Sequence, residues 1–194
     1  IAERKIPAEV TVVEMSSFQL DGINTFRPDI AVLLNITPDH LDRYGYSLEN
    51  YSESKWRITS NQISSDYLVY NYDDLEIGKH IKAKNTKAKL VPVSIERQLE
   101  TAGFHSCIGL KKKEFTLHTP HKKPFSMAIQ ELALQGKHNL FNSMAAGVTG
   151  RILELRNESI RESLTHFEGI EHRLEFVATV NEIKFINDSK STNV

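Results

Sequence analysis

Two short apolar runs end in residues that could bind a metal ion. The run "IAVLLN" (30–35) is followed, after Ile36, by "TPDHLDRY" (37–44), and "VTVVE" (10–14) ends in Glu14. Short runs rich in Val, Ile and Leu are typical of buried parallel strands, and ligands gather at the carboxyl ends of such strands. Glu14 and His40 are therefore candidate ligands for Mg²⁺ or Mn²⁺. The alternative, which spacing alone favours, is a helix-capping Glu14 and a solvated His40.

Lys55 is a second candidate, because it lies on the apolar face of an expected helix over 47–62. Leu48, Tyr51, Lys55 and Ile58 recur there every three or four positions. Burial favours the neutral amine of a lysine, and a neutral amine can take up CO₂ to form a carbamate, which is an oxygen ligand for metals. The alternative is a lysine at the edge of the stripe with its ammonium in water, and the residues alone favour it.

Further polar side chains could bind a nucleotide. Asn139 and Asn142 lie one turn apart at the start of an expected helix, where they could bind a base or cap the helix. Arg173 could bind a phosphate or form a rim salt bridge. Asp188 and Lys190, in the polar segment "NDSKSTN", could orient a ribose and a phosphoryl group, or simply be solvated. A phosphate-binding loop of the type G-x-x-x-x-G-K-[ST] does not occur in the sequence.

The order of expected elements predicts a doubly wound α/β fold with a mostly parallel sheet. An antiparallel hairpin is expected over 103–119, and a second one turns at Asn181–Glu182 after a hinge at 167–172. We place a domain boundary near 170, which gives domains at 1–170 and 171–194. The other expected elements are strands at 66–71 and 89–94 and helices at 73–84, 139–154 and 157–167.

Composition and charge indicate a soluble globular protein. The 194 residues are 40% hydrophobic and 25% charged, with a net charge of -1, which gives no reason to expect binding to nucleic acid or to a membrane. Cys107 is the one cysteine, so an intrachain disulfide is excluded, as is common for cytoplasmic proteins. The chain starts at Ile1 rather than at a methionine, and we expect it to be a piece of a larger protein.

Six segments together resemble the Mur ligase family of peptidoglycan synthesis in their order and spacing. The resemblance implies most of a central ATP-binding domain that lacks its phosphate-loop portion, followed by the first strands of a Rossmann-like, amino-acid-binding C-terminal domain. The segments are "EMSSFQLD" (14–21), "LNITPDHLDRYG" (34–45), "YSESKWRI" (51–58), "GKHNLFNSMAA" (136–146), "FEGIEHRLE" (167–175) and "INDSKSTN" (186–193).

The resemblance also implies a role for each candidate residue. It implies two Mg²⁺ ions, one bound by a glutamate and the other by a histidine and a carbamylated lysine. The implied roles are Glu14 for the first Mg²⁺; His40 and Lys55 for the second; Ser16 and Gln19 for the UDP-linked substrate; Asn139 and Asn142 for adenine; Arg173 for phosphate; Asp188 for ribose; and Lys190 and Thr192 for the phosphoryl group and the amino acid.

The implied reaction is ATP-dependent amide formation through an acyl phosphate, in which two anions must approach each other near metals and an arginine. "SSFQL" and "NDSKSTN" point to the family branch that adds D-glutamate to UDP-N-acetylmuramoyl-L-alanine in cell-wall synthesis. The resemblance implies a monomer that acts in the cytoplasm, and the piece alone is expected to be inactive.

Three alternatives remain at this point. The first is another Mur or folylpolyglutamate-type ligase. The second is a metal-dependent hydrolase that uses Glu14, Asp39, His40 and Asp42 and needs no ATP. The third is a nucleotide-binding module without catalysis. The second and third account less well for Lys55 together with "GKHNLFN" and "NDSKSTN".

Overall fold

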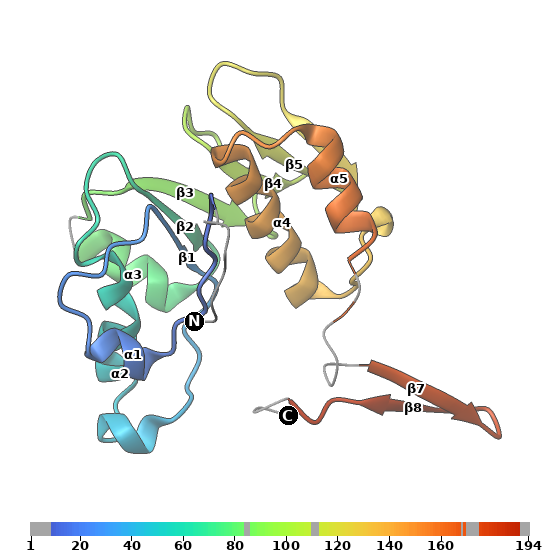
Figure 1. Cartoon of the computed structure of the whole chain (residues 1–194), viewed down its shortest axis with the longest axis horizontal. Coiled ribbons are helices and arrows are strands. Elements are labelled where there is room, and N and C mark those ends of the chain that lie inside the picture. Colours follow the sequence, from blue (N-terminus) through green and yellow to red (C-terminus); the bar gives the residue numbers. More distant parts are fainter. Residues whose placement is uncertain (1–8, 84–85, 110–112, 168, 170–174, 191–194) are drawn as a thin grey trace. The chain divides into compact units, whose positions relative to one another are not determined.

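The computed structural model describes residues 9–83, 86–109, 113–167, 169 and 175–190 (Figure 1). They fall in two compact units. The first comprises the described residues up to Leu68 together with Asp74–Lys89, and the second comprises Val69–Asp73 and the described residues from Leu90 onward.

The strands form one six-stranded sheet and one two-stranded sheet. The larger sheet has the order β1-β2-β3-β4-β5-β6, and the smaller one pairs β7 with β8. The bounds are β1 Ile30–Leu33, β2 Tyr67–Asn71, β3 Lys89–Ser94, β4 His105–Ile108, β5 Glu114–His118, β6 Phe125–Ala128, β7 Glu175–Val180 and β8 Ile183–Asn187.

Backbone hydrogen bonds show that the first strands run parallel. The Tyr67 amide, at the start of β2, donates to the Asp29 carbonyl just before β1 over 2.9 Å. For β2 and β3, the Lys89 amide at the start of β3 donates to the Asp66 carbonyl before β2 over 2.8 Å, and the Tyr72 amide after β2 donates to Val93 of β3 over 2.9 Å. β3 pairs with β4 in parallel, whereas β4–β5 and β5–β6 are antiparallel. The prediction of a mostly parallel sheet with an antiparallel hairpin is therefore confirmed, although the hairpin turn at 110–112 lies outside the described residues.

The prediction of a strand over 10–14 was wrong. This segment belongs to no strand, and Val10, Val12 and Val13 are 54%, 93% and 54% exposed. An apolar β-branched run forms a strand only where a neighbour supplies main-chain hydrogen bonds and burial. Among the described residues β1 is the first strand of the sheet, with β2 as its neighbour. β1 itself is buried at only Ala31 and Leu33, so the expectation of full burial was also wrong.

Three helices of the first unit pack on one another. They are α1 Ser17–Asp21, α2 Leu48–Trp56 and α3 Leu75–Ala83, which confirms helices near 47–62 and 73–84. The ring of Trp56 stacks on that of His80 with 5.0 Å between centroids, which joins α2 to α3. The Ser54 hydroxyl donates to the Ser17 carbonyl over 2.9 Å, which joins α2 to α1.

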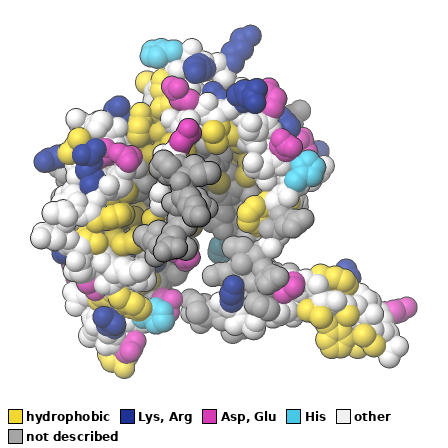
Figure 2. Space-filling model, viewed as in Figure 1, with side chains coloured by type: hydrophobic (Ala, Val, Ile, Leu, Met, Phe, Trp, Pro, Cys, Tyr) yellow, Lys and Arg dark blue, Asp and Glu magenta, His cyan; other side chains and the backbone are white. Residues whose placement is uncertain are grey.

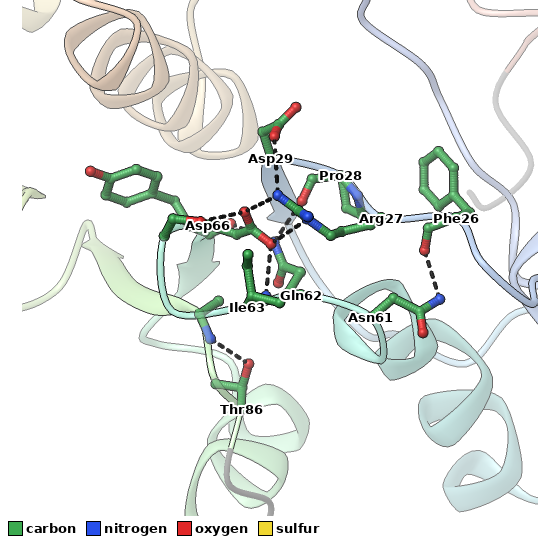
Figure 3. Close-up of polar contacts among 12 residues, drawn as sticks. Phe26, Arg27, Pro28, Asp29, Asn61, Gln62, Ile63, Asp66 and Thr86 are labelled. Atoms are coloured by element: carbon green, nitrogen blue, oxygen red, sulfur yellow. Dashed lines mark hydrogen bonds and ion pairs between the residues drawn. The ribbon is translucent and has the colours of Figure 1, made fainter.

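An ion pair between the exposed Arg27 and the buried Asp66 ties the loop before β1 to the turn before β2 (Figure 3). Arg27 Nε lies 3.0 Å from Asp66 Oδ2, and its Nη2 lies 3.2 Å from Oδ1. The Ile63 amide also donates to Asp66 Oδ2 over 2.8 Å. Burial raises the pKa of Asp66, but the Ile63 amide and the Arg27 guanidinium outweigh burial and hold this pKa below its ordinary value.

In the second unit, α4 Lys137–Ile152 packs on β4 and β5, and α5 Asn157–Thr165 packs on α4 (Figure 1). Gly147 allows this close approach, because a Cβ at this position would lie 2.9 Å from Leu117 Cδ1. The core beneath α4 includes Phe115, Leu117 and Met144, all fully buried. The two predicted helices over 139–154 and 157–167 are thus confirmed.

The hairpin β7–β8 turns at Asn181 and Glu182, with φ of 48° and 67°, as the sequence predicts. Its apolar side chains are largely exposed and form a hydrophobic area in Figure 2. The Rossmann-like character of this part and the boundary near 170 stay predictions, because most of the expected hinge lies outside the described residues. No helix in the described part of the chain is long and apolar enough to cross a membrane.

Candidate functional site

The turn after β1 holds His40 in an unusual backbone conformation. His40 precedes the 3-10 helix Leu41–Tyr44 and has a φ of 48°, in the left-handed region. Its ring meets the Phe18 ring edge-to-face at 5.3 Å, and the Arg43 guanidinium lies 4.4 Å from the centre of the same Phe18 ring. Left-handed non-glycine residues cost energy and cluster at functional sites. The imidazole is 53% exposed, with Nε2 3.7 Å from Asp39 Oδ2, so it is accessible to a ligand.

The same turn is anchored to two helices. The Tyr44 hydroxyl lies 3.0 Å from Asp21 Oδ2 of α1 and 3.2 Å from Ser54 Oγ of α2. At the base of the turn, the Ile36 amide donates to Asp74 Oδ2 over 3.0 Å. These contacts fix the segment that follows β1, including His40, relative to the helices that carry Ser16, Gln19 and Lys55.

Lys55 is directed toward the carboxyl end of β1. Its Nζ donates to the carbonyl of Asn35, two residues after β1, over 3.4 Å, and lies 5.0 Å from the centre of the Tyr51 ring. The side chain is half-buried. The predicted apolar stripe was partly wrong, because only Tyr51 of its four members is buried. The buried face of α2 also includes Ser52, Ser54 and Trp56, whose hydroxyl and indole groups find partners in α1 and α3.

Ser16 and Gln19 form a reciprocal cap at the start of α1. Gln19 Oε1 accepts from the Ser16 amide over 2.8 Å, and Ser16 Oγ accepts from the Gln19 amide over 3.3 Å. Both side chains are exposed. Because the cap occupies Oε1, the Gln19 NH₂ group remains available to donate to a ligand.

Glu14, His40 and Lys55 are the predicted metal ligands of the first unit. Glu14 is exposed and lies two residues before the α1 cap. In the described part of the chain, neither Glu14 nor His40 joins two other His, Cys, Asp or Glu side chains at metal-binding distance. The proximity of Glu14, His40 and Lys55 therefore stays a prediction.

In the second unit, Asn139 and Asn142 lie in the first turns of α4. Asn139 Nδ2 donates to the carbonyl of Gln135, which precedes the helix, over 2.9 Å. The Asn142 side chain is exposed. Gly136 precedes α4 with a φ of 100°, a conformation that favours glycine. Asp188 and Lys190 are exposed after β8, and Arg173 and Thr192 lie outside the described residues.

Sequence reasoning missed one cluster of chemically active side chains, His105, Cys107 and His118. They lie on paired strands. Burial is the main reason why the pKa of His118 is below its ordinary value, and the neighbouring His105 lowers this pKa further. The signal was present in "HSC" and "TLH", where these residues alternate on two predicted strands of one hairpin. The cluster forms only because the register of the two strands places His118 opposite His105.

Comparison with known proteins gives a consistent result. Residues 3–150 match the model of the Mur ligase middle domain. The chain is 48% identical over 183 residues to the UDP-N-acetylmuramoylalanine--D-glutamate ligase of Christiangramia forsetii, covering 94% of this chain and 40% of that protein. It is 44% identical over 189 residues to the ligase of the same name from Salinibacter ruber, with 97% and 40% covered. The chain thus spans 40% of the length of these two relatives.

Solved structures agree on the fold. MurF from Acinetobacter baumannii matches with a TM-score of 0.60 at 24% identity, covering 84% of this chain and 34% of that one. A UDP-N-acetylmuramoyl-L-alanyl-D-glutamate--2,6-diaminopimelate ligase matches with a TM-score of 0.61 at 23% identity, covering 86% and 34%. At these identities the structural likeness supports the fold alone.

Proposed function

The chain belongs to the Mur ligase family, and we propose that it is part of the ligase that adds D-glutamate to UDP-N-acetylmuramoyl-L-alanine. The observation that carries this proposal is the 48% identity over 94% of the chain to a relative of that name. The motif "SSFQL", which forms α1 and its cap, supports the same branch of the family.

The proposed reaction activates a carboxylate and then forms an amide. The terminal carboxylate of UDP-N-acetylmuramoyl-L-alanine attacks the γ-phosphorus of ATP, which releases ADP and gives an acyl phosphate. The amine of D-glutamate then attacks the acyl carbon, and inorganic phosphate leaves as the amine loses a proton. Because the reacting groups are anionic, positive charge near them is the main requirement of the site.

Residues of the first unit fit the binding of Mg²⁺. Carboxylate, imidazole and carbamate offer the oxygen and nitrogen ligands that this chemistry requires, and Lys55 reaches the end of β1 next to the turn of His40. We assign Glu14 to one ion, and His40 with carbamylated Lys55 to a second. When bound, the ions would neutralise charge on the phosphates and the attacking carboxylate.

Side-chain amides would orient the two nucleotide substrates. The NH₂ group of Gln19, left over by the α1 cap, would donate to the UDP-linked substrate beside Ser16. In the second unit Asn139 uses its NH₂ group on Gln135, so its oxygen would accept from the amino group of adenine, with Asn142 beside it. Arg173, Asp188, Lys190 and Thr192 would complete the ATP and amino-acid contacts. We further propose that the parent enzyme is a monomer acting in the cytoplasm.

The competing hydrolase is less well supported. It requires Glu14, Asp39, His40 and Asp42 to share a metal, and in the described ranges these side chains do not form a metal-binding group. The relatives that cover nearly all of this chain carry the names of ligases rather than hydrolases.

Amino-acid selectivity of the full-length parent tests the proposal. The purified enzyme is incubated with ATP, Mg²⁺ and UDP-N-acetylmuramoyl-L-alanine, and phosphate release is measured with D-glutamate, L-glutamate, L-alanine, L-lysine or diaminopimelate. We expect release with D-glutamate and background values with the others. Preference for another amino acid would assign the chain to a different branch, and hydrolysis of the UDP-linked substrate without ATP would favour the hydrolase.

A further inference from the structure

The strands β4 and β5 bring two histidines and a cysteine together on one face of the sheet. His105 and Cys107 are two positions apart on β4, so their side chains share a face. The antiparallel register places His118 of β5 opposite His105 and Thr116 opposite Cys107. One ligand atom from each of His105, Cys107 and His118 lies within 4.8 Å of the others.

His105 is held with one ring nitrogen free. Nδ1 lies 3.0 Å from the Gly103 carbonyl, which can only accept, so Nδ1 carries the hydrogen and donates. Nε2 therefore bears a lone pair. The side chain is only 3% exposed, yet Nε2 has no hydrogen-bond partner. Buried polar atoms normally have a partner, and metal-binding histidines normally donate their other nitrogen to a carbonyl or carboxylate, as His105 does.

The other two groups converge on one threonine hydroxyl. Thr116 Oγ1 lies 2.9 Å from His118 Nε2 and 3.5 Å from Cys107 Sγ. The same hydroxyl also lies 3.3 Å from the Cys107 carbonyl. It has a single hydrogen, so it can donate to only one of these groups at a time. The rings of His105 and His118 stack with 4.0 Å between centroids and 12° between planes, which aligns their edges.

The face is also accessible. Thr116 and His118 line a cavity of about 610 Å³, together with Gln98, Glu114 and Lys113. Cys107 and His105 are buried and do not line the cavity, so an ion entering from the cavity would meet His118 first. A water molecule or a small ligand in the cavity can supply a fourth ligand.

We propose that His105, Cys107 and His118 bind one divalent transition-metal ion of the zinc class, separate from the magnesium site of the ligase. Two imidazoles and a thiolate are the ligands that Zn²⁺ and Co²⁺ prefer, whereas Mg²⁺ and Ca²⁺ prefer oxygen. Tetrahedral Zn²⁺ holds its ligand atoms about 3.5 Å apart, and the three ligand atoms here lie within 4.8 Å of one another, so each pair needs to close by no more than about 1 Å. The ion would join β4 to β5 with its fourth position facing the cavity.

Metal titration of the whole 194-residue chain tests this site. Reduced, chelator-treated protein is titrated with Zn²⁺ by calorimetry and with Co²⁺ by absorption spectroscopy. We expect one equivalent of each metal to bind, a thiolate-to-cobalt charge-transfer band in the near ultraviolet, and a rise in Tm with Zn²⁺. Cys107→Ser should abolish the band and the rise in Tm, and should weaken Zn²⁺ binding at least about tenfold.

Two further variants complete the experiment. His118→Gln should weaken Zn²⁺ binding to a similar extent. The control is His121→Asn, because His121 is exposed outside the cluster and asparagine tolerates its φ of 59°. Circular dichroism of the metal-free variants establishes that each is folded. Absence of stoichiometric binding, a charge-transfer band that survives Cys107→Ser, or equal weakening by His121→Asn would overturn the proposal.

Discussion

Lys55 carries the most specific residue-scale prediction. In the full-length parent, Lys55→Ala should lower kcat by about 100-fold or more, because a ligand of the second Mg²⁺ is lost. A small carboxylic acid such as acetate should restore part of the activity by placing an oxygen in the vacated position. Steady-state kinetics with and without acetate measure both effects.

The control for Lys55 is Lys89→Ala. The Nζ atoms of the two lysines lie equally far, 5.0 Å, from a tyrosine ring, but Lys89 starts β3 and is exposed. This variant should keep wild-type kinetics and show no response to acetate. Near-normal turnover of Lys55→Ala without acetate would contradict the assignment of Lys55 as a metal ligand.

Asp66 gives a residue-scale prediction for stability and its pH dependence. The Asp66 side chain is only 2% exposed and pairs with Arg27, which is 41% exposed. Because Asp66→Asn removes the charge of the buried partner, it should lower the free energy of unfolding at pH 7 by about 1–3 kcal/mol. The pKa of Asp66 is lower in the folded than in the unfolded chain, so its stabilisation is present above about pH 4 and lost at lower pH. Urea unfolding between pH 7 and pH 3 should show that the free energy of unfolding changes less with pH for the variant than for the wild type.

Asp29→Asn is the matched control. Asp29 lies 3.8 Å from the same arginine, but its side chain is 93% exposed, and an exposed pair contributes little. Its unfolding free energy and pH profile should match those of the wild type. Equal effects of the two substitutions would show that the buried geometry in Figure 3 does not control the stability of this turn.

At the scale of elements, two helical glycines should respond oppositely to substitution by alanine. Gly147→Ala places a Cβ 2.9 Å from Leu117 Cδ1 in the core between α4 and β5, and overpacking there should destabilise by about 1–3 kcal/mol. Gly78→Ala in α3 meets no atom within 4 Å, so its better helix propensity should stabilise by about 0.5–1 kcal/mol. Thermal unfolding of the two variants measures both; a stabilising Gly147→Ala would contradict the close packing of α4.

The sequence predicted elements best where local pattern and tertiary partners agree. β2 and β3 lie at the predicted positions because each apolar run has a neighbouring strand and is largely buried. The run at 10–14 has the same local pattern but lacks a partner strand among the described residues, so pattern alone gave the wrong result. The cluster of His105, Cys107 and His118 depends on the register of β4 against β5, which no local pattern specifies.

The candidate site was predictable only in part for a similar reason. The cap formed by Ser16 and Gln19 is local and follows from spacing, and the direction of Lys55 follows approximately from helical periodicity. The left-handed His40 is accompanied by contacts with Phe18 and by the anchoring of Tyr44 on Asp21, and these partners come from elsewhere in the first unit. Such contacts are set by tertiary packing rather than by neighbours in the sequence.

For the whole molecule, we predict that the purified 194-residue chain does not ligate and binds ATP weakly. It spans 40% of the length of its relatives, and its sequence has no G-x-x-x-x-G-K-[ST] loop to hold the phosphates through backbone amides. Calorimetry with ATP and Mg²⁺ and mass spectrometry of the reaction mixture measure binding and ligation. Amide formation, or a Kd in the low micromolar range, would show that this part of the enzyme is sufficient by itself.

We propose that the full-length parent activates a carboxylate with ATP and joins it to D-glutamate. The most direct test uses UDP-N-acetylmuramoyl-L-alanine labelled with oxygen-18 in both carboxylate oxygens. If the carboxylate attacks the γ-phosphorus, one labelled oxygen leaves with phosphate and the other remains in the new amide, and mass spectrometry detects both. We predict singly labelled phosphate and singly labelled amide product, formed only when ATP and D-glutamate are both present. Unlabelled phosphate, or an amide product formed without ATP, would contradict the account.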